Sequence, residues 1–167
     1  MKKLVLERFS IALVAALVAW SPFAEAQALV KKTISLALAK KIAAAAEAKA
    51  AKDSLAVVIT ILDDGGNLVY LERMDNAQLG SIEVATEKAK TAVFFKRPSK
   101  AYEDRIVSGE TKLLKIPNVM PIEGGIPLII DGALVGAVGV SGGTGQQDGS
   151  VAQAAVNAFS ASLELSK

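Results

Sequence analysis

The chain has 167 residues, a formal net charge of +2 and an apolar fraction of 51%. It contains neither histidine nor cysteine, which excludes Ser-His-Asp and Cys-His catalysis, conventional zinc sites and disulfides. The nearly neutral charge balance argues against nucleic acids and acidic membranes as partners.

The first 26 residues have the three parts of a secretory signal peptide. A basic start precedes the apolar run Phe9–Trp20 and the A-x-A arrangement of Ala24 and Ala26. We expect cleavage after Ala26, no stable membrane insertion, and a periplasmic or secreted protein with one folded domain over residues 27–167. An uncleaved membrane anchor is the alternative, although the apolar run is short for a bilayer span.

The segment that follows predicts a helix and then a hairpin. Residues 33–53 carry apolar side chains at helical spacing, and Thr33 or Ser35 can cap this helix. The β-branched run at 55–63, the turn sequence DGGN at 64–67 and a further apolar run predict two antiparallel strands.

Residues 81–95 predict a second helix, with Ser81 as its N-cap. Pro98 stops this helix, and Ser99 can cap a short helix after it. The next segment is mostly loop, with a short strand expected at residues 112–115. The apolar stripe of the second helix comprises Ile82, Ala85, Ala89, Ala92 and Val93.

The clearest hairpin signal is Asp131-Gly132 between two apolar runs, which is typical of a type I′ turn. A last helix is expected over residues 149–165, with Asp148 as its N-cap. Hairpin connections and strands that are apolar on both faces predict a largely antiparallel sheet of four or five strands, covered on both faces by helices.

The glycine-rich segment before the last helix does not match a nucleotide-binding loop. Asp148 stands where G-x-G-x-x-G needs its third glycine, and residues 135–155 contain no lysine for a P-loop. We interpret the segment as a strand-to-helix turn, with Gly136 and Gly139 allowing close approach by a helix or a flat ligand. A ligand or subunit contact through the exposed amides of the loop is the alternative.

Three stretches together carry a resemblance to a known family: VVITILDDGGNLVYLERMDNA, EKAKTAVFFKRPS and IEGGIPLIIDGALVGAVGVSGGTGQQD. They resemble the GlcG/HbpS family of haem-binding proteins, which is similar to the C-terminal domain of PduO-type proteins. The resemblance covers nearly all of residues 27–167. It implies an α/β (α+β) fold, a single α-β-α domain with a mainly antiparallel five-stranded sheet flanked by helices. It also implies homo-oligomers, often octamers, that bind haem, another tetrapyrrole or a small carboxylated ligand.

If haem binds, its iron needs a ligand other than histidine. The candidates are Tyr70, Met74, Tyr102 and Met120. Tyr70 and Met74 fall on one face of the second strand, because side chains alternate along a strand. Ordinary packing is the alternative for all four residues.

Arg73 and Lys88 stand on the matched motifs and can pair with haem propionates. We therefore expect the pocket where the end of the second strand meets the second helix, at a subunit boundary or within one chain. Intramolecular or intersubunit ion pairs are the alternative for both cations.

These observations favour an exported haem- or tetrapyrrole-binding protein. Haem sequestration, iron handling and redox sensing are the alternatives for its role. A small enzyme that uses Lys88 or Arg73 on a carboxylated or aromatic metabolite is one alternative. An oligomeric structural or interaction protein is another. The enzyme alternative has no recognisable nucleophile–base pair behind it.

Overall fold

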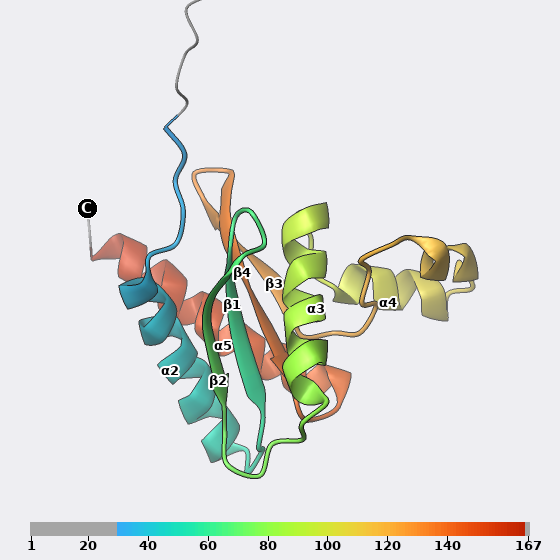
Figure 1. Cartoon of the computed structure of the whole chain (residues 1–167), viewed down its shortest axis with the longest axis horizontal. Helices are drawn as coiled ribbons and strands as arrows, with labels where there is room; N and C mark the ends of the chain where they lie inside the picture. Colours follow the sequence, from blue (N-terminus) through green and yellow to red (C-terminus); the bar gives the residue numbers. More distant parts are fainter. Residues whose placement is uncertain (1–29, 166–167) are drawn as a thin grey trace, which may run out of the picture. The chain divides into compact units, whose positions relative to one another are not determined.

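The computed structural model describes residues 30–165 (Figure 1). The predicted signal peptide, with Phe9–Trp20 and the cleavage site after Ala26, lies outside the described residues. The unit that begins at Lys32 holds the helices and strands described. In chain order they are α2 (Leu36–Lys52), β1 (Val58–Asp63), β2 (Leu68–Arg73), α3 (Ser81–Phe95), α4 (Lys100–Val107), the 3-10 helix η1 (Thr111–Lys115), β3 (Gly125–Ile130), β4 (Ala133–Ser141) and α5 (Gly145–Glu164).

The four strands form one antiparallel sheet in the order β2-β1-β4-β3. The α+β class and the antiparallel sheet are confirmed, whereas the expected fifth strand is wrong for the described residues. The strand expected at residues 112–115 is part of η1, which lies beside α4 and away from the sheet (Figure 1). Only Leu113 of this segment is buried, while Leu114 is 61% exposed, so its side chains lack the alternation that would anchor a strand.

The hairpin between β3 and β4 turns at Asp131 and Gly132, as the sequence predicts. Their φ angles are 51° and 78°. A type I′ turn requires positive φ at both central residues, and its twist matches that of the flanking strands.

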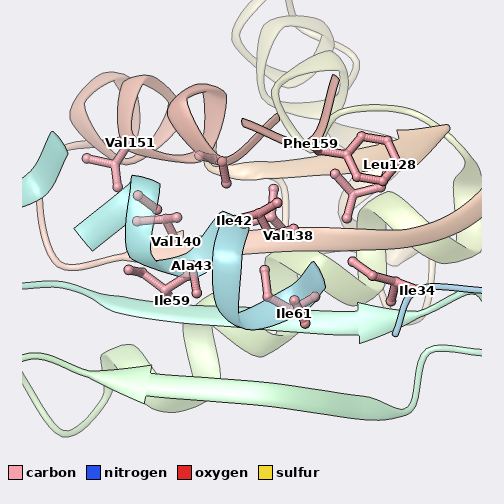
Figure 2. Close-up of a cluster of buried hydrophobic side chains, with 14 of the residues drawn as sticks. Ile34, Ile42, Ala43, Ile59, Ile61, Leu128, Val138, Val140, Val151 and Phe159 are labelled. Carbon is pink, nitrogen blue, oxygen red and sulfur yellow. The ribbon is translucent and has the colours of Figure 1, made fainter. Parts of the chain in front are cut away.

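One face of the sheet is covered by α2 and α5 and holds the larger side chains (Figures 1 and 2). A single buried cluster joins the two helices to β1, β3 and β4. Each fully buried valine, isoleucine or leucine stabilises the fold by about 1.5–3 kcal/mol relative to an exposed one. The central members of this buried cluster are Ile42, Ile59, Ile61, Leu128, Val138, Val140, Val151 and Phe159.

The other face is covered by α3 and is built from small side chains. Ala89 and Ala92 of α3 pack with Leu62 and Ala137 of the sheet. At Gly139 a Cβ atom would lie 2.0 Å from the backbone oxygen of Ala85, so the glycine allows the helix backbone to touch the strand. The close approach expected at this glycine is confirmed, and the partner is a helix.

The helix starts agree only in part with the predictions. Ser35 caps α2 by accepting a hydrogen bond from the N–H of Leu38, which confirms one of the two caps considered. Ser81 is not a cap: it is the first helical residue of α3, and Gly80 occupies the N-cap position. Ile82, expected on the apolar stripe, is 37% exposed, whereas Ser81 on the same turn is buried.

Helix α5 begins four residues earlier than predicted, at Gly145. Its N-cap is Thr144, which forms a capping box with Gln147, so the assignment of this role to Asp148 is wrong. Asp148 lies within the first turns of the helix and is buried. Its partners are described with the site below.

Candidate functional site

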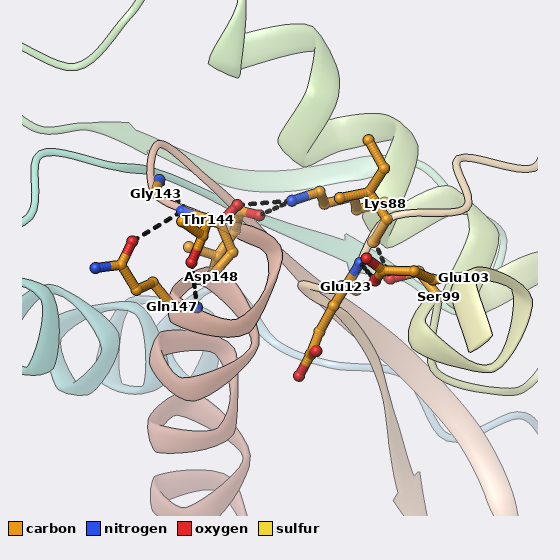
Figure 3. A network of polar contacts seen from close by, with 11 residues as sticks. Lys88, Ser99, Glu103, Glu123, Gly143, Thr144, Gln147 and Asp148 are labelled. Carbon is orange, nitrogen blue, oxygen red and sulfur yellow. Dashed lines mark hydrogen bonds and ion pairs between the residues drawn. The ribbon is translucent and has the colours of Figure 1, made fainter. Parts of the chain in front are cut away.

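Two of the matched stretches of sequence, the second and the third, meet at a buried ion pair. Lys88 of α3 extends beneath the strand-to-helix turn, and its Nζ donates to Oδ2 of Asp148 at 2.7 Å and to the backbone oxygen of Val140 at 3.1 Å (Figure 3). The other carboxylate oxygen of Asp148 accepts the N–H of Gly143 at 2.8 Å. One lysine therefore ties α3 to the end of β4 and to the start of α5.

Glycines close over this pair. At Gly124 a Cβ atom would lie 2.6 Å from the backbone oxygen of Val140 and about as close to the side chains of Lys88 and Asp148, at 3.1 and 3.0 Å. At Gly125 a Cβ atom would lie 2.1 Å from the backbone oxygen of Lys88. The two glycines thus let the chain cross directly over the ion pair before it enters β3.

The segment that carries these glycines is fastened to the start of α4. The hydroxyl of Ser99 donates to the backbone oxygen of Ile122 and accepts the N–H of Gly125. The carboxylate of Glu103 accepts the N–H of Glu123 at 2.6 Å. Ser99 was expected to cap α4; it occupies that position, but its side chain forms these bonds instead of a cap bond.

A groove of about 420 Å³ lies beside this segment. It is bounded by the first turns of α5, by the residues that lead into β3 and by the start of α4. Its walls combine glycines and apolar atoms with amides, a hydroxyl and one group of each charge. The lining residues are Pro98, Lys100, Glu123, Gly124, Gly125, Ile126, Gln146, Gly149, Ser150 and Gln153.

Lys100 and Glu123 supply the charges of the groove. The Nζ of Lys100 lies 2.8 Å from Asp104 and 3.5 Å from the carboxylate of Glu123, and its side chain is 49% exposed. The hydrogen bond to Asp104, reinforced by the charge of Glu123, raises the pKa of Lys100 above its ordinary value. The ammonium therefore stays charged at neutral pH and can meet an anionic group of a ligand.

Two of the predicted site residues lie together at the β2 edge of the sheet, whereas the groove lies at the β3 edge. Tyr70 and Met74 pack against the buried cluster under α2 and α5. The phenol of Tyr70 donates a 2.8 Å hydrogen bond to Glu72, and mainly for this reason its pKa is raised above the ordinary value. A tyrosinate ligand is disfavoured there, because Glu72 stabilises the protonated phenol.

The other four predicted residues lie at separate places, and they do not line the groove. Arg73 is exposed at the end of β2, and Lys88 is enclosed with Asp148. Tyr102 is buried and contacts the ring of Phe95 edge-on. Met120 is half-buried in the loop before β3, where its N–H donates to Thr91 of α3.

The sequence analysis did not predict the groove, although one of its walls has a recognisable sequence pattern. Gln146, Ser150 and Gln153 follow one another at helical spacing on α5, and they form a polar line opposite the apolar face. The Glu123-Gly124-Gly125 stretch belongs to a matched motif, but the motif does not indicate that it lines a groove. Its folding back onto the start of α5 brings together residues far apart in sequence, which no local pattern reveals.

The described residues offer no cluster of three or more acidic side chains able to hold a metal ion directly. Over the same residues 30–165, none of the helices is both long and apolar enough to cross a membrane.

Known proteins are similar to this chain in both sequence and fold. The family model described as "Haem degrading protein HbpS-like" matches residues 34–157. Protein GlcG of Escherichia coli is 42% identical over 111 residues, which cover 66% of this chain and 83% of GlcG.

Two solved structures superpose well. The crystal structure of a double mutant of Streptomyces reticuli HbpS has a TM-score of 0.73 at 31% identity, and the match covers 82% of this chain and 95% of that one. The crystal structure of a PduOC–haem complex has a TM-score of 0.68 at 33% identity, and the match covers 75% of this chain and 94% of that one. By sequence and by structure, the chain belongs to the HbpS-like family.

Proposed function

We propose that this chain binds haem, and that the groove beside α5 receives it. The observation that carries the proposal is a 420 Å³ groove whose wall includes Gly124, Gly125 and Gly149, in a chain similar to one crystallised with haem. A stretch of wall without side chains suits a flat macrocycle. Haem, when bound, supplies an iron centre that can take axial ligands or change oxidation state.

The groove residues fit the other parts of haem. Pro98 and Ile126 offer apolar atoms to the ring, and the ammonium of Lys100 lies where a propionate can reach it. Glu123, Ser150 and the two glutamines provide oxygen atoms. The lining therefore offers apolar atoms for the macrocycle, a cation for a propionate and oxygen atoms for the iron, without histidine or cysteine.

A haemin titration of the mature protein, followed by the Soret band, tests this proposal. Ser150→Phe places a ring against the wall of the groove and should weaken binding at least tenfold, because the macrocycle and the ring compete for one space. Ser160→Phe is the matched control, since Ser160 is an exposed residue of α5 outside the groove. Equal binding by the two variants would rule out the groove as the haem site.

The role of Lys100 has its own test. Lys100→Ala should weaken haemin binding several-fold and Lys41→Ala, on an exposed position of α2, should not. The difference should shrink with haemin dimethyl ester, whose propionates carry no charge.

We further propose that the protein is exported and acts in the periplasm or outside the cell, in haem sequestration, iron handling or redox sensing. The basic start, the apolar run and the A-x-A site support this. N-terminal sequencing of the secreted protein should begin at Gln27. A mature chain that retains Phe9–Trp20 would refute it.

Self-association is the third part of the proposal. Large apolar side chains remain on the surface of the described unit, including Leu79 at 73%, Val107 at 82% and Leu114 at 61% exposure. Light scattering at micromolar concentration should give a homo-oligomer. A monomer would contradict this, and the number of subunits decides whether the octamer implied by the family resemblance applies.

A further inference from the structure

The proposed haem site has few side chains that could reach the iron. Imidazole and thiolate are absent from the entire sequence. The tyrosines and the described methionines lie outside the groove: Tyr70 and Met74 at the opposite, β2 edge of the sheet, Tyr102 buried against Phe95, and Met120 in the loop beside Thr91. Within one chain, the ligand therefore comes from the oxygen or amine groups that line the groove.

Glu123 is the one carboxylate in the lining of this groove. Its side chain points away from the Lys88–Asp148 pair, into the space between the start of α5 and β3 (Figure 3). Its side chain is 22% exposed, so the carboxylate is neither enclosed nor free in solvent. A ligand in the groove would meet it directly.

A glycine within a helix makes room for this carboxylate. A Cβ atom at Gly149 would lie 2.2 Å from Oε1 of Glu123. Glycine inside a helix is less favourable than alanine by about 0.5–1 kcal/mol, so the position is not explained by helix formation. The missing side chain lets Glu123 lie against the first turns of α5.

Contacts of the Glu123 backbone and of Lys100 also position the carboxylate. The N–H of Glu123 donates to Glu103, and Lys100 stands 3.5 Å from the carboxylate on the other side. Lys100 has Asp104 as a nearer partner, so Glu123 can turn to another cation without stranding the ammonium. A ligand group is useful when neighbouring contacts position it in advance.

We propose that the carboxylate of Glu123 binds the iron of haem in this groove, an inference that rests on the proposed function. A carboxylate is a hard oxygen donor and favours ferric over ferrous iron. The site should therefore prefer haemin to its reduced form, and the bound ferric haem should have the spectrum of an oxygen-ligated, high-spin iron.

Two probes separate the iron from the ring: haemin, and metal-free protoporphyrin IX. Glu123→Gln keeps the shape of the side chain but removes its charge and most of its affinity for iron. It should weaken haemin binding by at least about tenfold, because even the loss of a group that only orients a metal ligand costs about 10–100-fold in affinity, and it should alter the electron paramagnetic resonance of the ferric haem. It should leave protoporphyrin IX binding, followed by fluorescence quenching, unchanged.

Glu83→Gln is the matched control, because Glu83 lies exposed on the first turn of α3 and outside the groove. Thermal unfolding of both variants verifies that they are folded. An unchanged haemin spectrum and affinity in Glu123→Gln would overturn the inference while the proposed haem site stands. An equal loss for both probes would also overturn it, since Glu123 would then shape the groove without binding iron. A wild-type protein that binds neither probe would overturn the proposed function itself, and the inference with it.

Discussion

The ammonium of Lys88 and the carboxylate of Asp148 lie 2.7 Å apart, with 2% and 3% of their side chains exposed. This contact joins α3 to α5 across the end of the sheet (Figure 3). Desolvation offsets much of the attraction in a buried ion pair, but removal of one partner leaves a buried charge without compensation. The pair therefore acts mainly as a constraint on how the second and third matched stretches are assembled.

Lys88→Met and Asp148→Leu should each lower the free energy of unfolding by about 3–5 kcal/mol. The double variant should be more stable than either single one, because neither charge is then stranded. Urea unfolding in a double-mutant cycle measures the coupling. Additive losses would mean that the two charges do not interact in the folded protein.

Thr144→Ala should lower the stability of the fold by about 0.5–2 kcal/mol, because Thr144 is the N-cap of α5. Asp148→Ala should cost more than Thr144→Ala, since it strands the buried ammonium of Lys88 rather than removing a cap. The two variants are compared by the midpoints of their denaturant unfolding curves. The reverse order would mean that the contact of Asp148 with Lys88 contributes little to stability.

Gly139→Ala should destabilise the protein by about 1–3 kcal/mol or more, because overpacking forces the backbones apart. The added Cβ would lie 2.0 Å from the oxygen of Ala85 and 2.8 Å from the N of Ala89, atoms that cannot turn aside. Gly80→Ala is the control: its φ is −61° and no atom lies within 4 Å of the new Cβ. This control should stay within about 1 kcal/mol of wild type in thermal unfolding.

The pKa of the Tyr70 phenol should lie above its ordinary value of 10.0, mainly because Glu72 accepts its hydrogen bond. A raised pKa in the folded state means that this contact stabilises the protein at neutral pH and up to the ordinary pKa. That stabilisation is lost as the pH rises through the raised value. Tyr102→Phe leaves Tyr70 as the only tyrosine, so its phenolate absorbance can be titrated alone.

In that background, adding Glu72→Gln should move the midpoint back toward 10.0. A midpoint at or below 10.0 with Glu72 intact would show that the hydrogen bond is absent in solution. It would also revive Tyr70 as a tyrosinate ligand for iron.

Local patterns predicted most of the fold. The period of α3 and the Asp131-Gly132 turn are correct because neighbouring residues decide them. The cap expected at Asp148 is wrong because a distant partner binds this side chain, whereas the capping box of Thr144 and Gln147 is a local pattern. Asp148 has the side chain of a cap, but Lys88, sixty positions away in the sequence, binds it. Residues 112–115, which were expected to form a strand, are part of η1 and pack beside α4.

The candidate site was less predictable than the fold. The glycine-rich segment before α5 was correctly interpreted as a turn preceded by a point of close approach at Gly139, but the glycines that line the groove were not singled out. Its lining comes from three elements, so neither the polar line on α5 nor Glu123 indicates a site alone. Tyr70, Met74, Tyr102 and Met120 were predicted from their chemical type, and Arg73 and Lys88 from the matched motifs. Neither criterion reveals which side chains meet in the fold.

The location of bound haem is the most direct test of this account. In NMR spectra of the isotope-labelled protein, paramagnetic haemin should broaden the backbone amide signals of Gly124, Gly125 and Gly149, relative to diamagnetic zinc protoporphyrin. The signals of Tyr70 and Met74, on the face of the sheet under α2, should remain sharp. Broadening centred on Tyr70 and Met74, with the groove glycines unaffected, would contradict the central claim that the groove beside α5 is the haem site.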